Sequence, residues 1–240
     1  MKILGSDFDG TLNHGGIDPE KCAAIQQWRA QGNKFGIISG RGKDAQSAIQ
    51  TAYPTLELDF FAACSGSMIA DSDGQVIYEA RCTEVSIPQL LADLASWGCR
   101  HANICSAQMW SVPLPATDLP EIIFFNQIST YIEPFDVTQH VVERIREAYG
   151  EWLNPLQNGC CIDIVPQGVN KAQGLYRLME HYGCSYEDVI AVGDNINDTD
   201  MIREFRSYAM ANGVDSIKEL ADYIVEDVTE LIRMEMQAQA

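Results

Sequence analysis

The stretch Asp7-Phe8-Asp9-Gly10-Thr11-Leu12 decides the fold of this chain, and it directly follows the short strand-like run 2–6. In an extended segment, residues two positions apart point to the same side. The carboxylates of Asp7 and Asp9 are therefore expected to converge where the strand gives way to a turn at Gly10. Two neighbouring carboxylates repel each other unless a cation or a shared proton lies between them. Asp-Gly is also ordinary turn sequence, so the later segments must distinguish a site from a turn.

Composition restricts the classes of protein to which the chain can belong. With 240 residues, of which 46% are apolar and 21% charged, it can bury one large core or two modest ones. A formal net charge of −18 and the lack of a basic run argue against a nucleic-acid partner. The negative electrostatic field of such a chain would also repel an anionic substrate, unless a metal ion and local cations reversed that field at the site. No apolar run reaches membrane-spanning length, so no membrane partner is expected.

The eight cysteines include no CxxC pair. No secretory signal is recognised, because Asp7 and Asp9 interrupt the N-terminal apolar residues. We therefore expect free thiols and a cytoplasmic location.

The N-terminal third alternates predicted strands and helices. Strand-like runs at 35–38 and 60–64 follow the opening strand, and helices are expected over 18–32 and 44–53. This alternation is typical of a parallel sheet with right-handed crossovers. The turn at 71–74 predicts a hairpin after the third strand.

Between residues 82 and 164 the pattern changes to α+β with antiparallel strands. Helices are expected from Ser86 to Gly98 and from Thr138 to Tyr149, and Asn158-Gly159 predicts a hairpin turn. The strand-like runs are 102–105, 109–112, 122–128, 152–156 and 160–165. The segment 82–164 is therefore predicted to be an inserted domain.

Strand–helix alternation resumes beyond Pro166. Asn170 precedes a predicted helix that ends at Gly183, and 189–192 is an unbroken apolar run, as buried parallel strands tend to be. Two more strands are expected at 208–211 and 223–225. Residues 1–81 and 165–240 are thus predicted to form one α/β core.

A second acidic cluster, Gly193-Asp194-Asn195-Ile196-Asn197-Asp198, follows the run 189–192. Because the carboxyl ends of parallel strands meet at one edge of the sheet, Asp194 and Asp198 are expected near Asp7 and Asp9. Oxygen ligands of this kind suit Mg²⁺, which also binds substrate phosphates. Taken alone, the cluster is equally a turn followed by a helix cap.

Two further features predict an anion site. Ser39-Gly40 follows the strand-like run 35–38 and precedes a helix, so its hydroxyl and N–H groups can hold a phosphoryl oxygen. Lys171 occupies the first position of a predicted helix. A cation there interacts unfavourably with the helix dipole, at a cost of about 0.3–1 kcal/mol. This placement indicates that its ammonium neutralises an anion or a carboxylate cluster. A loop turn and a tolerated surface lysine are the alternatives.

Together, the four clusters resemble the motifs of the haloacid dehalogenase superfamily of aspartyl phosphotransferases. Residues 7–12 are similar to its first motif DxDGTL, Ser39-Gly40 to the second, Lys171 to the third, and 193–198 to the fourth, GDxxND. The inserted domain is similar to the α+β cap of the Cof-type (IIB) sugar-phosphate phosphatases. The expected fold class is therefore α/β, a Rossmann-like parallel-sheet core with an inserted α+β cap.

The resemblance implies a role for each residue. Asp7 would attack phosphorus and form an aspartyl-phosphate, and Asp9 would act first as the general acid and then as the general base. Thr11 would also fix the geometry of the loop. The implied Mg²⁺ ligands are Asp7, Asp9 through its backbone carbonyl, Asp194 and Asp198, and the implied phosphate-binding residues are Thr11, Ser39, Gly40 and Lys171.

The predicted function is a Mg²⁺-dependent phosphatase whose partner is a small-molecule phosphate ester. A sugar phosphate is the leading candidate, with phosphoglycolate or another small metabolite behind it, since nothing within 82–164 identifies the substrate. Two alternatives use the same core: a phosphomutase and a non-catalytic sugar-phosphate-binding protein. A signalling receiver domain is disfavoured, because such domains are about half this length.

Overall fold

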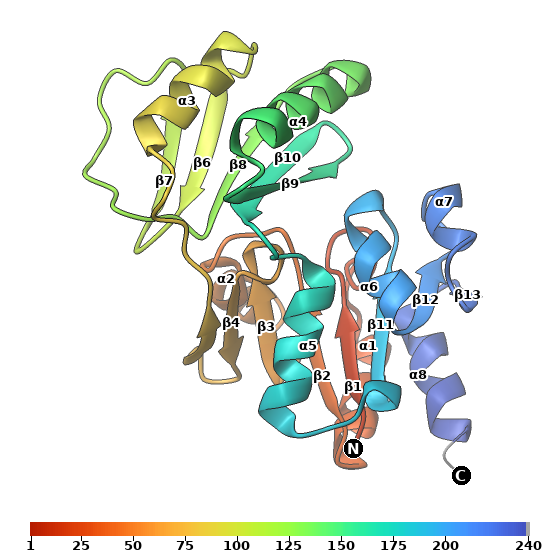
Figure 1. Ribbon diagram of the computed structural model, residues 1–240. Helices are drawn as coiled ribbons and strands as arrows, with labels where there is room; N and C mark the ends of the chain where they lie inside the picture. The colour runs from red at the N-terminus through yellow and green to blue at the C-terminus, as the bar shows by residue number, and fades with distance from the viewer. Residues whose placement is uncertain (239–240) are drawn as a thin grey trace.

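An eight-stranded sheet forms the centre of the larger domain (Figure 1). In this computed structural model, which describes residues 1–238, the strand order is β13-β12-β11-β1-β2-β3-β4-β5. The hairpin of β4 (Met68–Asp71) and β5 (Val76–Glu79) is antiparallel and extends the sheet beyond β3. The mutually parallel strands are β1 (Ile3–Ser6), β2 (Lys34–Ile38), β3 (Phe60–Ala63), β11 (Val189–Gly193), β12 (Arg206–Met210) and β13 (Tyr223–Val225).

Helices cover both faces of this sheet. One face carries α1 (Pro19–Ala30), α2 (Ala45–Ala52) and α8 (Val228–Gln237). The other face carries α5 (Lys171–Tyr182), α6 (Thr199–Glu204) and α7 (Asp215–Lys218). The predicted α/β fold with a parallel sheet is therefore confirmed.

Local sequence sets where these helices begin and end. Asp18 accepts a hydrogen bond from the N–H of Lys21 at 2.8 Å and caps α1, in which Pro19 is the first residue. Asn170 caps α5 in the same way, and Gly183 ends it with a left-handed backbone (φ 66°). The predicted helix starts at Asp18 and Asn170 and the helix end at Gly183 are therefore confirmed, and α5 places Lys171 in its first turn.

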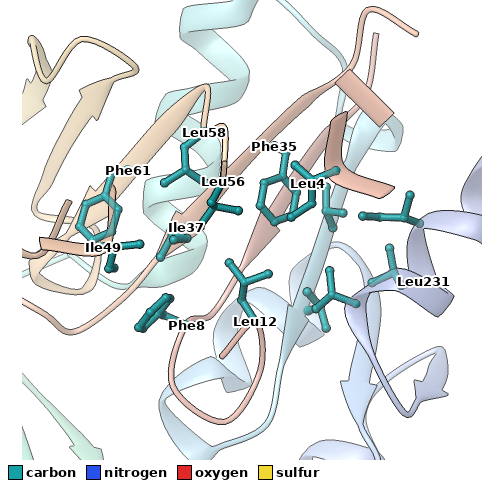
Figure 2. Packing of buried hydrophobic residues seen from close by; sticks show 14 of the residues in the cluster. Leu4, Phe8, Leu12, Phe35, Ile37, Ile49, Leu56, Leu58, Phe61 and Leu231 are labelled. Carbon is teal, nitrogen blue, oxygen red and sulfur yellow. The ribbon is translucent and has the colours of Figure 1, made fainter. Parts of the chain in front are cut away.

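The core sheet is buried on both sides, and the loop after β1 takes part in the packing. Leu4 faces α1 and α8, whereas its neighbour Ile3 faces α5, so the strand contributes to two apolar layers. Figure 2 shows Phe8 and Leu12 in the first of these layers, on the side of Ile37. Each buried side chain of this size stabilises the fold by about 1.5–3 kcal/mol. These two residues therefore hold the segment 7–12 firmly against the core.

The smaller domain, the cap, has its own five-stranded antiparallel sheet, in the order β7-β6-β8-β10-β9. The helices α3 (Ile87–Ser96) and α4 (Phe135–Tyr149) pack against this sheet around a separate apolar core. The strands are β6 (His101–Cys105), β7 (Met109–Pro113), β8 (Gln127–Tyr131), β9 (Leu153–Asn158) and β10 (Cys161–Pro166). This domain is the predicted α+β insertion. We keep 1–81, 82–164 and 165–240 as our proposed domain boundaries.

The strand predicted over 122–128 was misplaced. The structure begins β8 only at Gln127, and Ile123 is 76% exposed. Phe125 is buried in the cap core but pairs with Cys82 in an isolated bridge, so this part of the apolar run lies outside the strands of the sheet. The real strand is more polar, because Gln127 and Ser129 face the core domain whereas Ile128 faces the cap interior.

Two further observations concern the sequence predictions. All eight cysteines are free thiols, as predicted. Among the described residues 1–238, no helix has both the length and the apolar character needed to cross a membrane. Short 3-10 helices complete the chain at η1 (Cys64–Gly66), η2 (Tyr186–Asp188) and η3 (Ile196–Asp198).

Candidate active site

The four sequence clusters lie together at one edge of the core sheet. Segments 7–12, 39–40 and 194–198 follow β1, β2 and β11, which are adjacent parallel strands. The first turn of α5 reaches the same edge, where Lys171 contacts two of these segments. This edge faces the cap (Figure 1). It is the position at which open α/β sheets bind ligands.

Lys171 lies at the centre of the cluster. Its Nζ donates a hydrogen bond to Asp7 Oδ1 at 2.7 Å and another to Asp198, and the lysine side chain is completely buried. Burial alone would lower the pKa of Lys171, but the attraction of Asp198 and Asp7 outweighs it and raises the pKa. The ammonium therefore stays charged, and the predicted neutralisation of a carboxylate cluster is observed.

Asp198 organises the fourth motif. Its Oδ2 accepts hydrogen bonds from the backbone N–H groups of Asp194 at 2.9 Å and Asn195 at 3.0 Å, while Oδ1 accepts from Lys171. A Cβ atom on Gly193 would lie 2.5 Å from the Asp198 carboxylate, so only glycine fits there. The turn-and-cap interpretation is thus confirmed for this segment, and the metal-site interpretation stays a prediction.

Thr11 and Gly10 fix the position of Asp194. The Thr11 hydroxyl donates to Asp194 Oδ1 at 2.6 Å and is buried. Gly10 has φ 82°, and a Cβ atom there would lie 2.4 Å from Asp194 Oδ2. Asn212 donates to the Gly10 carbonyl at 2.9 Å and supports the same turn. In this arrangement Thr11 performs the predicted structural role, and its direct contact with phosphate stays a prediction.

Asp7, Asp194 and Asp198 together form a candidate metal site. One oxygen from each lies within 4.8 Å of the others. Burial raises the pKa of Asp7 to about 8; repulsion by Asp198 and Asp194 adds to this, and Lys171 opposes it. Burial also raises the pKa of Asp194. Three carboxylates beside one ammonium leave an excess of negative charge that a divalent cation would offset, so these residues fit Mg²⁺.

Asp9 points away from this cluster. Its carboxylate, 56% exposed, receives two hydrogen bonds of 2.7 Å from the Arg41 guanidinium. Arg41 also lies over the ring of Phe8, 5.0 Å from its centroid, and the hydrogen bond to Asp9 raises the pKa of Arg41. The Asp9 side chain thus lies outside the carboxylate cluster.

The loop of the second motif contacts the cap. Ser39 is buried and its Oγ accepts a hydrogen bond from the backbone N–H of Arg41 at 3.1 Å. The carbonyl of Gly40 accepts from Gln127 of the cap at 2.7 Å, and Asp163 of the cap lies so close that a Cβ on Gly40 would approach it to 2.4 Å. Sequence reasoning missed both cap residues. Asp163, a charged residue within the apolar strand β10, was the one available signal.

A separate cavity of about 320 Å³ lies between α4 and β9 of the cap and η3 and α6 of the core. Arg146, Gln157 and Asn197 are among its lining residues, whereas Asp7 and Lys171 are not. It borders the fourth motif from outside and is distinct from the carboxylate cluster.

Comparison with known proteins agrees with this geometry. The sequence profile of haloacid dehalogenase-like hydrolases matches residues 4–114 and 121–230. A 5-amino-6-(5-phospho-D-ribitylamino)uracil phosphatase of Bacillus subtilis is 27% identical over 94% of this chain and 90% of its own length. A pyridoxal phosphate phosphatase of Escherichia coli is 25% identical over 95% of this chain and 94% of its own.

Solved structures share the fold at lower identity. A haloacid dehalogenase-like hydrolase of B. subtilis superposes with a TM-score of 0.84 at 18% identity, covering 97% of this chain and 99% of that one. A subclass IIB sugar phosphatase of the same superfamily gives a TM-score of 0.80 at 18% identity, with 98% of each chain covered.

The chain belongs to the haloacid dehalogenase-like hydrolases, and it is an enzyme of the phosphoric monoester hydrolase class. Within the superfamily, the Cof-type (IIB) assignment made from the four motifs and the inserted domain is confirmed.

Proposed function

We propose that this enzyme is a Mg²⁺-dependent phosphatase that hydrolyses a small phosphorylated metabolite, a sugar phosphate or a related compound, through an aspartyl-phosphate. One observation carries the proposal: Lys171, Asp7, Asp194 and Asp198 converge beneath the cap at the ends of β1 and β11. Phosphoryl transfer depends chiefly on positioning and on neutralising charge, and this cluster supplies both.

Asp7 is the proposed nucleophile. Lys171 holds its Oδ1, which fixes the orientation of the carboxylate while Oδ2 remains for attack. Oδ2 forms a bond to phosphorus, the bond from phosphorus to the ester oxygen breaks, and the departing oxygen takes a proton from Asp9. The product of this step is the aspartyl-phosphate and the free alcohol.

Hydrolysis of the intermediate completes the cycle. Asp9 takes a proton from a water molecule as the water oxygen attacks phosphorus, and the bond from phosphorus to the Asp7 oxygen breaks. Inorganic phosphate leaves, and both carboxyl groups return to their starting states. Asp9 must leave Arg41 to reach the ester oxygen, so Arg41 is free to contact the substrate during turnover.

The remaining residues hold the phosphoryl group and the metal. Ser39, Gly40 and Lys171 are proposed to contact the phosphoryl oxygens. Bound Mg²⁺ would draw electron density from the phosphoryl group and stabilise the ionised form of Asp7. Its proposed ligands are Asp7, Asp194, Asp198 and the backbone carbonyl of Asp9; the excess of buried carboxylates supports this set.

The relatives support a small phosphate ester as substrate, because they act on a phosphoribityl compound and on pyridoxal phosphate. We also propose a cytoplasmic location, which the eight free thiols support. The net charge of −18 supports our view that nucleic acid is not the partner.

Release of phosphate from p-nitrophenyl phosphate in the presence of Mg²⁺ tests this function. We expect steady release by the wild type and none by Asp7→Asn. Product analysis on hexose phosphates separates this reaction from a phosphomutase reaction, which would give an isomerised sugar phosphate without free phosphate. A wild-type protein that binds sugar phosphates but releases no phosphate would contradict the proposal.

A further inference from the structure

A cluster of buried polar side chains joins the cap to the second motif. Gln127 and Ser129 come from β8 and Asp163 from the adjacent strand β10. Asp163 Oδ1 accepts hydrogen bonds from Ser129 Oγ at 2.7 Å and from Gln127 Nε2 at 3.2 Å. On the core side, Gln127 Nε2 donates to the Gly40 carbonyl at 2.7 Å, and Ser65 Oγ lies 3.4 Å from Asp163 Oδ2. The cluster therefore borders the proposed phosphate-binding loop.

Asp163 is a buried carboxylate without a contacting cation. It is 7% exposed, and none of the ion pairs formed within residues 1–238 includes it. Burial raises the pKa of Asp163 to about 6, against the opposing effects of the Ser129 hydrogen bond and the charge of Lys171. Burying a carboxylate with only neutral partners costs free energy. Fold stability alone therefore does not account for this residue.

Two acceptor atoms in the cluster lack a good donor. Asp163 Oδ2 has only the long contact from Ser65. Gln127 Oε1 is buried and has no hydrogen-bond partner among the described residues, although the rest of its side chain is well bonded. Buried acceptors are nearly always satisfied in folded proteins. These two acceptors are therefore available to receive hydrogen bonds from a bound ligand.

We propose that Asp163 and Gln127 form the leaving-group subsite of the cap and accept hydrogen bonds from hydroxyl groups of a polyol or sugar phosphate. This inference rests on the proposed phosphatase function, with the substrate admitted as the cap moves away from Gly40. The position beside the second motif places those hydroxyl groups near the ester oxygen. A leaving group that carries a carboxylate would meet the Asp163 carboxylate and be repelled. The subsite therefore selects sugar phosphates over phosphoglycolate.

Three probes test the subsite with the full-length enzyme and Mg²⁺: sorbitol 6-phosphate, 2-phosphoglycolate and p-nitrophenyl phosphate. For the wild type, we expect kcat/KM to be at least about 10-fold higher for sorbitol 6-phosphate than for 2-phosphoglycolate. Asp163→Asn should lower the value for sorbitol 6-phosphate by about 10- to 100-fold, the range for a hydrogen bond to a charged group. It should change the value for p-nitrophenyl phosphate, which has no hydroxyl group, by less than about 3-fold.

Asp136→Asn is the matched control, because Asp136 is an exposed carboxylate of the cap helix α4. This substitution should leave kcat/KM unchanged for all three probes. An equal loss of kcat/KM for every probe in Asp163→Asn would show that Asp163 only stabilises the contact between cap and core. That result would overturn the inference. An unchanged value for sorbitol 6-phosphate, or a wild type that prefers 2-phosphoglycolate, would overturn it as well.

Failure of the proposed function has a different signature. A wild type that hydrolyses none of the probes would refute the phosphatase mechanism. Calorimetric binding of sorbitol 6-phosphate then still tests the subsite, with affinity expected to fall about 10-fold in Asp163→Asn. Equal affinities in the two proteins would refute the subsite.

Discussion

Lys171 Nζ lies 2.7 Å from Asp7 Oδ1 and also donates to Asp198, so a single buried ammonium joins the first motif to the fourth. All three side chains are buried. A buried charge is tolerated when it is paired and hydrogen-bonded, and removing one partner leaves the others uncompensated. This relationship makes Lys171 important for both stability and catalysis.

Lys171→Met should lower the free energy of unfolding at pH 7 by about 3–5 kcal/mol, because it leaves the buried Asp7 and Asp198 side chains without their hydrogen-bonding cation. Urea denaturation in EDTA measures the change. The control is Lys218→Met, which breaks only a surface pair with Asp215 and should cost less than about 1 kcal/mol. Equal losses in the two variants would contradict the proposed importance of the buried pair.

Asp7→Asn should abolish turnover while the fold remains intact. The amide cannot form the acyl-phosphate, so kcat should fall by at least about 10³-fold. Phosphate release and far-ultraviolet circular dichroism measure the two properties. Asp73→Asn, in the exposed turn between β4 and β5, is the control and should behave as the wild type. Normal hydrolysis by Asp7→Asn would exclude Asp7 as the nucleophile.

Removal of the metal should abolish activity reversibly, with EDTA stopping phosphate release and Mg²⁺ restoring it. Binding also has a readout that does not depend on activity. Mg²⁺ at 100 times its Kd should stabilise the wild type by about 2.7 kcal/mol, seen as a rise in Tm. Asp194→Asn removes one proposed ligand and should shrink that rise. Full activity after EDTA treatment would refute the metal requirement.

The raised pKa of Asp163 predicts a dependence of stability on pH. The folded state holds the Asp163 proton up to about pH 6, whereas the unfolded state releases it near 3.8. Between these values the folded state binds more protons, so this residue's contribution to stability falls as the pH rises. Asp163→Asn removes that loss. The free energy of unfolding of Asp163→Asn, relative to that of the wild type, should therefore rise by about 2–3 kcal/mol from pH 4 to pH 7.

Urea denaturation at pH 4, 5.5 and 7 measures the difference between the two proteins. Asp136→Asn again provides the control for an exposed carboxylate. A constant difference between wild type and Asp163→Asn across this range would show that Asp163 titrates normally.

Gly40→Ala should disturb the contact between the domains, because the new methyl group would approach Asp163 Oδ2 to 2.4 Å. We expect a loss of about 1–3 kcal/mol of stability, typical of overpacking. In Gly40→Ala/Asp163→Ala the clash is absent, so a double-mutant cycle should give a coupling energy of at least about 0.5 kcal/mol. Additive effects would show that the two residues do not meet.

Much of the fold followed from local sequence pattern. The apolar runs predicted β1, β2 and β11, and Asp18 and Asn170 correctly predicted the helix starts. Because parallel strands present their carboxyl ends at one edge, the meeting of Asp7 with Asp194 and Asp198 also followed from topology. The strand β8 was misplaced because Phe125, in the apolar run before it, packs in the cap core from an isolated bridge and not from a strand of the sheet.

The sequence alone therefore determined the core fold, the family and the residues of the carboxylate cluster, since each depends on local periodicity or on motifs at strand ends. Only the tertiary structure decided that Arg41 holds Asp9, that Thr11 bonds Asp194 across 183 positions, and that Gln127 reaches Gly40 across 87. The first two contacts join loops that follow different strands of the core sheet, and the third depends on how the cap lies against the core. No local pattern encodes that geometry, and it is there, between cap and core, that we place the choice of substrate.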